Sequence, residues 1–271
     1  MKQICERVGM SRQNFYRARK ERRRQEVDER FIVELVRAER RLQPRLGGRK
    51  LYVLLKEPLS DAGVKLGRDR FFKVLRKKGL LVEPLPRGPI TTMSNHSLPI
   101  FPNRLKELEL VRAHQAWVTD ITYIRTETGF VYLTLLMDAF SRVIVGWNLG
   151  QNLGAEESLK ALKMALKHLP EGAAPLHHSD RGCQFCSHAY VGALQKEGLE
   201  ISMTEVQHCA ENAKAERING ILKQEYGLRD TFRCFEDARK SVEQAIMLYN
   251  HRRPHSSLKM KTPAEVHRAA A

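Results

Sequence analysis

Three acidic side chains have the types and settings that chemistry on phosphate groups requires. Asp120 lies inside an apolar run, Asp180 ends a short predicted strand, and Glu216 falls in a segment with helical spacing. Moving a phosphoryl group between oxygens requires neutralised charge on the attacking and leaving oxygens, which two divalent metal ions about 3.5–4 Å apart can supply. Magnesium prefers hard carboxylate oxygens. These residues predict metal-dependent phosphoryl transfer, with Mg²⁺ as the metal and Mn²⁺ as a substitute.

The sequence supports the three carboxylates as site residues to different degrees. A buried Asp is unfavourable unless a cation or hydrogen bonds compensate it, so Asp120 inside an apolar strand is a candidate by itself. The spacing between Asp180 and Glu216 is weaker support for a site, because roughly one residue in nine is acidic and such spacings arise by chance. Asp138 ends a predicted strand at a turn, an ordinary structural place for Asp, and we leave it out of the metal site.

The surrounding pattern predicts the elements that position these carboxylates. Three β-branched runs, at residues 117–124, 130–137 and 143–149, predict an antiparallel meander. Helices and strands alternate after it, with helices expected at 155–169, 187–197 and 210–226 and strands at 175–178 and 199–203. This order describes an α/β fold with a mixed five-stranded sheet and flanking helices, as in the ribonuclease-H-like fold.

The first 83 residues have helical spacing throughout and no strand alternation. Two places resemble helix-turn-helix units, in which a turn sets a second helix to enter the major groove. One turns at Gly9 and continues from an N-cap at Ser11; the other turns between Gly63 and Gly67. Either helix could instead be a solvated basic face. We predict an all-α, helix-turn-helix-like DNA-binding region at 1–83.

Residues 84–102 hold five of the eleven prolines, a composition that blocks both helix and central strand. We therefore predict a Pro-rich linker at 84–110, a catalytic core at 111–232 and a C-terminal helical extension of that core at 233–271. Thr262, Pro263 and Glu265 predict a capping box that opens a final helix.

Net charge indicates the partner. The formal charge is +16, and residues 1–110 hold 27 basic and 13 acidic side chains, whereas residues 111–271 hold 20 and 18. An excess confined to one segment favours contact with a polyanion over a merely soluble surface. No stretch is apolar enough for a membrane span, and the charge at Glu6 argues against a secretion signal. Five cysteines, an odd number, favour reduced thiols, so we expect a cytoplasmic, nucleoid-associated protein.

Several segments of the sequence together resemble one protein family. They are Trp-Val-Thr-Asp-Ile-Thr-Tyr-Ile at 117–124, the stretches at 132–147, 178–185 and 211–217, Tyr-Asn-His-Arg-Arg-Pro-His-Ser-Ser-Leu at 249–258, and Thr-Pro-Ala-Glu at 262–265. The chain resembles bacterial insertion-sequence transposases of the OrfB type, whose core is similar to that of retroviral integrases. The resemblance covers most of residues 100–268.

The family's catalytic pattern, called DDE, is two Asp and a Glu, with 35 residues between the second and third and a basic residue seven after the Glu. Asp120, Asp180, Glu216 and Lys223 fill it here. The resemblance implies a transposase that cleaves and joins the strands of double-stranded DNA at element ends and target. It also implies a homo-oligomer on DNA and a companion OrfA-type protein from an upstream frame.

Basic and polar residues near this pattern are candidate DNA contacts. Seven residues are about two helical turns, so Lys223 shares a helix face with Glu216 and Asn212. The full set of candidate contacts is Lys223, Asn212, Lys214, Arg217, Arg68, Arg70, Lys73, Arg252 and Arg253. Lys214 and Arg217 could equally be solvated charges.

Two features depart from the family pattern or compete with it. Residues 204–209 carry an acidic residue and no glycine where the family has a basic, Gly-containing turn. Cys183 and Cys186 with nearby histidines suggest zinc, but a single Cys pair is weak support and we expect no zinc. Two other functions remain open: a DNA-binding relative that does not cut, and a nuclease that hydrolyses without rejoining.

Overall fold

The computed structural model describes residues 5, 7, 9–83, 98–205 and 213–270. The chain divides into two compact units, Met1–Glu83 and Pro84–Ala271. No helix in the described ranges is long and apolar enough to cross a membrane.

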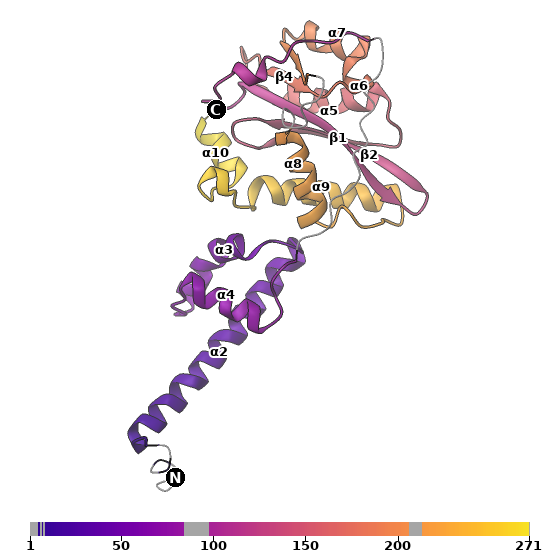
Figure 1. Ribbon diagram of the computed structural model, residues 1–271. Coiled ribbons are helices and arrows are strands. Elements are labelled where there is room, and N and C mark those ends of the chain that lie inside the picture. The colour runs from indigo at the N-terminus through magenta and orange to yellow at the C-terminus, as the bar shows by residue number, and fades with distance from the viewer. Residues whose placement is uncertain (1–4, 6, 8, 84–97, 206–212, 271) are drawn as a thin grey trace. The chain divides into compact units, whose positions relative to one another are not determined.

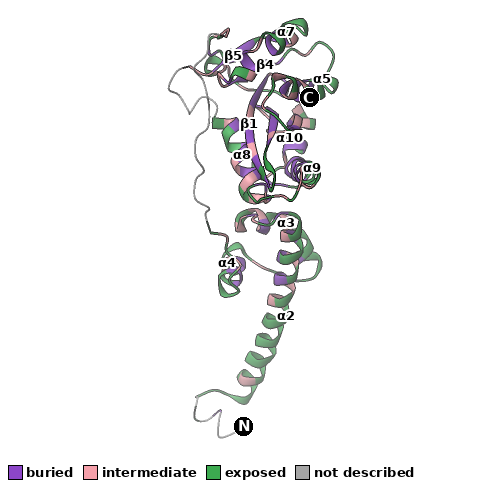
Figure 2. Ribbon diagram, turned by 90° about the vertical axis from the view of Figure 1, so that its right-hand side faces the viewer, coloured by how far each residue is buried: buried purple, intermediate pink, exposed green. Residues whose placement is uncertain are grey.

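The first unit is built from helices α2 (Arg12–Leu42), α3 (Gly48–Asp61) and α4 (Arg68–Lys77), shown in Figure 1. Ser11 caps α2 by accepting the N–H of Asn14 at 3.2 Å, as the sequence predicted. With no Gly or Pro to stop it, α2 runs for 31 residues and joins two segments that the sequence indicated separately. Its N-terminal half is exposed nearly all round (Figure 2).

Helices α3 and α4 form the second of the two expected helix pairs. The chain turns at Gly63, whose φ of 71° is the left-handed conformation that favours glycine at a helix end. The N–H of Val64 reaches back to the carbonyl of Leu59 at 2.8 Å and closes the helix. Helix α3 continues through Pro58 to this turn. On α4, buried Phe71, Val74 and Leu75 oppose an exposed basic face.

The second unit contains the mixed five-stranded sheet that the sequence predicted. Its strands are β1 (Ala116–Thr126), β2 (Gly129–Asp138), β3 (Ile144–Gly150), β4 (Leu176–Ser179) and β5 (Ile201–Met203). They are ordered β3-β2-β1-β4-β5. Strands β1, β2 and β3 form the antiparallel meander, and β4 and β5 run parallel to β1.

Helices cover both faces of this sheet (Figure 1). One face packs on α8 (Ala213–Glu225) and α9 (Phe235–His251), and the other packs on α5 (Ala155–Lys167), α6 (Cys183–Cys186) and α7 (His188–Lys196). Gly146 lets β3 and α5 pack closely together. A Cβ at this position would lie only 2.9 Å from the backbone nitrogen of Ala165 on α5. These layers form the ribonuclease-H-like arrangement.

The C-terminal segment of the chain packs against the rest of the second unit. Short 3₁₀ turns lie at Leu105–Glu107 and Ser256–Leu258, and α10 (Pro263–Ala270) ends the described chain. The capping box is confirmed: Thr262 N–H donates to Glu265 Oε2 at 2.7 Å, and Glu265 N–H donates to Thr262 Oγ1 at 3.3 Å.

The segment expected as a linker falls partly on residues 84–97, which lie outside the described residues. Its remainder is packed on the second unit. Leu98 and Phe101 contact the α5–α7 core, whereas Leu105, Leu108 and Leu110 contact the α8–α9 core.

Candidate functional site

Strand pairing brings two of the candidate carboxylates to neighbouring positions. Val118 of β1 is paired in parallel with His178 of β4. Asp120 and Asp180 each stand two residues further along the chain. Side chains two residues apart on a strand point to the same face, so parallel pairing directs both carboxylates to one place.

Both oxygens of Asp120 accept hydrogen bonds. The N–H of Ile121 donates to Oδ1 at 2.8 Å, and the side-chain amide of Asn219 on α8 donates to Oδ2 at 2.9 Å. Burial, with the negative charges of Asp180 and Glu216, raises the pKa of Asp120 to about 7 despite these two bonds. Asp180 and Glu216 therefore lie close enough to act on the Asp120 carboxylate.

Helix α8 supplies the remaining residues of the pattern. Glu216 is exposed near the start of the helix, and Lys223 is half-buried two turns later. Burial lowers the pKa of Lys223, while the negative charge of Asp120 opposes this shift. The ammonium group thus lies near the Asp120 carboxylate.

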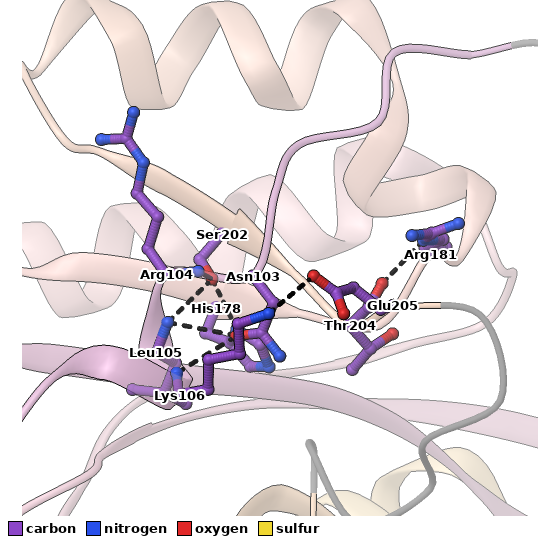
Figure 3. Close-up of polar contacts among 9 residues, drawn as sticks. All are labelled: Asn103, Arg104, Leu105, Lys106, His178, Arg181, Ser202, Thr204 and Glu205. Carbon is purple, nitrogen blue, oxygen red and sulfur yellow. Dashed lines mark hydrogen bonds and ion pairs between the residues drawn. The ribbon is translucent and has the colours of Figure 1, made fainter.

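Asp180 is held by the turn that follows β4. Its Oδ1 accepts the N–H of Gly182 at 3.0 Å, and burial raises its pKa. Arg181 donates from Nε to the carbonyl of Thr204 at 2.6 Å (Figure 3). This bond ties the Asp180 turn to the residues that follow β5.

The segment at residues 103–106, which precedes β1, lies against β4 and β5 at Ser202 and His178 (Figure 3). Ser202 Oγ accepts the N–H of Arg104 at 2.9 Å and lies 2.9 Å from His178 Nδ1. Lys106 forms a 3.0 Å ion pair with Glu205. Glu205 is the acidic residue of the atypical 204–209 segment, and residues 206–209 lie outside the described residues.

The carboxylates do not yet form a closed metal-binding group. In residues 5, 7, 9–83, 98–205 and 213–270, no three His, Cys, Asp or Glu side chains are placed to hold a metal ion as they stand. Three negative groups repel one another without a cation between them. Asp120 and Asp180 are set by adjacent strands, whereas Glu216 approaches from the separate helix α8.

Asp138 has a structural role. It is fully buried, and its carboxylate accepts the N–H of His114 at 2.7 Å and both the N–H and the Oγ–H of Ser141 at 2.7 Å each. These donors satisfy the carboxylate within the fold.

The Cys183 and Cys186 pair does not present two thiols together for a metal. Cys183 is exposed, whereas Cys186 is buried beside the sulfur of Met203 at 3.6 Å. Burial raises the pKa of the Cys186 thiol to about 11, which disfavours the thiolate that zinc requires.

The other candidate contacts have different surroundings. Arg68, Arg70 and Lys73 are exposed on α4, where Arg68 lies 3.0 Å from Asp69. On α8, Arg217 is exposed, and burial lowers the pKa of Lys214 to about 8. Asn212 lies outside the described residues, and Arg252 is exposed at the end of α9.

Arg253 differs from what the sequence suggested. Its side chain is only 2% exposed, and it donates from Nε and Nη2 to the two carboxylate oxygens of Glu225. Its charge is neutralised inside the fold, so we withdraw it as a DNA contact. Asn219, conversely, touches Asp120 although the sequence did not single it out; its position three residues after Glu216 was the available signal.

Comparison with known proteins gives this arrangement a family. Two models of the integrase core domain match residues 111–209 and 197–263. A chain of the simian T-cell lymphotropic virus intasome shares the fold, with a TM-score of 0.51, 18% identity, and 82% of this chain and 74% of that chain covered.

Two curated relatives come from Shigella sonnei. The insertion element IS600 31 kDa protein is 33% identical over 96% of each chain. The transposase for insertion sequence element IS629 is 30% identical over 78% of this chain and 71% of its own. With this identity and coverage, the chain belongs to the insertion-sequence transposases.

Proposed function

We propose that this protein cuts and rejoins DNA strands by metal-dependent phosphoryl transfer, with Asp120, Asp180 and Glu216 as the catalytic carboxylates. The observation that carries the proposal is the parallel pairing of β1 and β4, which directs Asp120 and Asp180 to one place, together with the bond to Asp120 from Asn219 on the helix that carries Glu216. Negative groups brought together in this way are what a divalent cation would compensate.

The donor set fits magnesium better than a softer metal. It consists of carboxylate oxygens, and the nearby thiol of Cys186 is buried and protonated. Two Mg²⁺ ions, with Mn²⁺ as a substitute, would supply charge neutralisation at the attacking and leaving oxygens. Asp120 and Asp180 would bind from fixed strands, while Glu216 would complete the site from α8.

The reaction consists of two phosphoryl transfers. In the first, the oxygen of a water bonds to phosphorus at an element end, and the departing oxygen leaves as a 3′-hydroxyl. In the second, that 3′-hydroxyl attacks a target phosphodiester, so one P–O bond forms as another breaks. In each step one P–O bond forms as another breaks, and the proton that the attacking oxygen loses is balanced by the proton that the departing oxygen takes up.

Substrate DNA would be held by charge. Lys223 on α8 lies near Asp120, and its ammonium would bind a phosphate next to the scissile one. The exposed basic face of α4, with Arg68, Arg70 and Lys73, would contact duplex DNA from the first unit. These residues act on the phosphate backbone and so contribute to affinity rather than sequence choice.

The reaction at two element ends would bring more than one copy of the chain onto DNA. We therefore propose a homo-oligomer on DNA, with an OrfA-type companion contributing to recognition of the ends.

A purified-protein assay with Mg²⁺ and DNA carrying the presumed element end tests this function. We expect strand cleavage and joining by the wild type, none by Asp120→Asn, and full activity in Glu156→Gln, which removes an exposed acid on the opposite face of the sheet. DNA binding should survive in both variants. Unchanged activity in Asp120→Asn would refute the assignment. Binding without cleavage by the wild type would favour a regulatory relative, and cleavage without joining a nuclease.

A further inference from the structure

The contact between Asn219 and Asp120 joins two elements that are 99 residues apart in the chain. Asn219 lies on α8 and is 6% exposed. Its Nδ2 donates to Asp120 Oδ2 at 2.9 Å, while the N–H of Ile121 donates to Oδ1 at 2.8 Å. With one donor on each oxygen, the carboxylate plane of Asp120 is fixed, and each oxygen keeps a lone pair for another partner.

The same bond sets the position of α8 against β1. Asn219 is three residues after Glu216, which places the two side chains on neighbouring positions of one helix face. A bond from Asn219 to Asp120 therefore limits both the rotation and the sliding of the helix that carries Glu216. Ile218 and Leu222, buried against the sheet, provide the apolar part of this packing.

Stability alone does not account for an asparagine at this position. Asn219 Oδ1 is buried and accepts no hydrogen bond within the described part of the chain. An unpaired buried acceptor is unfavourable, and an apolar residue of similar volume would avoid it. What the amide supplies, and an apolar residue cannot, is the donor to Asp120.

Asn250, a second buried asparagine in the same unit, has a purely structural role and serves as a comparison for Asn219. Asn250 on α9 accepts the N–H of Ile144 at 2.9 Å and donates to the carbonyl of Ile144 at 3.0 Å. Both of its polar groups are satisfied by backbone, and its partner is no candidate ligand.

We propose that Asn219 is a positioning residue, which holds Asp120 and the Glu216 helix in the arrangement that binds a divalent cation. The inference rests on the proposed function of the carboxylates. Residues that orient metal ligands through hydrogen bonds typically change metal affinity by about 10- to 100-fold when replaced.

The test is metal-dependent thermal stabilisation of the full chain, measured by titrating MgCl₂ or MnCl₂ without DNA. A bound cation raises the unfolding midpoint, so the titration gives a half-saturating metal concentration without any activity measurement. The variants are Asn219→Leu, which keeps the branched shape but has no donor, Asn219→Ala, which leaves a cavity, and Asn219→Ser, which keeps a shorter donor.

We expect Asn219→Leu and Asn219→Ala to raise the half-saturating concentration similarly, by about 10- to 100-fold, despite their different packing. Asn219→Ser should lie between them and the wild type. The matched control, Asn250→Leu, should lower the midpoint without metal and leave the half-saturating concentration unchanged.

Two results would overturn the inference in different ways. If the Asn219 variants lower the midpoint as Asn250→Leu does but bind metal like the wild type, Asn219 is structural and the carboxylate site stands. If neither metal raises the midpoint of the wild type, the proposed metal site fails and this inference falls with it. Asp120→Asn, which removes a ligand, should also reduce the metal-dependent rise.

Discussion

Arg253 and Glu225 form a two-bond ion pair that joins the C-terminal segment to helix α8. Arg253 Nε lies 2.7 Å from Glu225 Oε2, and Nη2 lies 2.9 Å from Oε1. The Arg253 side chain is 2% exposed and that of Glu225 is 16% exposed, so both charges depend on each other rather than on water. The pair fixes the end of the helix that carries Glu216 and Lys223.

We expect Arg253→Met to lower the free energy of unfolding by about 3–5 kcal/mol, because it removes both charge-assisted hydrogen bonds from Arg253 to the Glu225 carboxylate. Urea unfolding of the full chain measures this loss. Arg233→Met is the control: the Arg233–Asp237 pair is 78% and 39% exposed, and its removal should cost less than about 1 kcal/mol. Equal losses in the two variants would contradict a buried role for Arg253.

Replacement of Gly146 by alanine should separate β3 from α5. A Cβ at Gly146 would lie 2.8 Å from the Cβ of Ala165 and 2.9 Å from its backbone nitrogen, so the helix must shift. We expect a loss of about 1–3 kcal/mol in the free energy of unfolding. Gly192→Ala on α7 has open space around the new Cβ and should be neutral or stabilising by up to about 1 kcal/mol. The prediction fails if both alanines behave alike.

The buried His177 should make stability depend on pH. Burial and the neighbouring His178 lower the pKa of His177 to about 3, so the ring stays neutral in the folded protein, whereas the unfolded chain takes up a proton near pH 6.5. Its contribution is fully present above pH 6.5 and is lost as the pH falls toward 3.

Between about pH 6.5 and 5.5 the wild type should therefore lose on the order of 1 kcal/mol more than His177→Gln, which cannot be protonated. Urea unfolding at each pH measures the difference. His188→Gln, at an exposed position on α7, is the matched control and should follow the wild type. Parallel curves for wild type and His177→Gln would exclude this source of acid sensitivity.

Lys223 should contribute a phosphate contact. We expect Lys223→Gln to weaken binding of duplex DNA and to reduce the slope of log affinity against log salt by about 0.9, the value for one lost contact. Lys163→Gln removes an exposed charge from α5, on the other face of the sheet, and should leave the slope unchanged. An unaltered slope for Lys223→Gln would mean that its ammonium serves the carboxylates and not DNA.

The sequence by itself determined the features that depend on local chemistry. The meander of β1, β2 and β3 follows from β-branched runs separated by turns, and the caps at Ser11 and Thr262 follow from side chains that reach backbone three residues away. The family motifs in the sequence also single out the three carboxylates, because each of them lies inside or directly beside one of those motifs.

Only the tertiary structure decided which distant groups meet. The Asn219 bond to Asp120 spans 99 residues and the Arg253 pair with Glu225 spans 28, and neither can be read from spacing. The sequence made Arg253 a candidate DNA contact, but folding places the Glu225 carboxylate beside it and buries the pair. A helix cap forms between residues a few positions apart, so the sequence predicts it. The environment of a charged side chain depends on the distant elements that pack against it, so only the folded structure shows it.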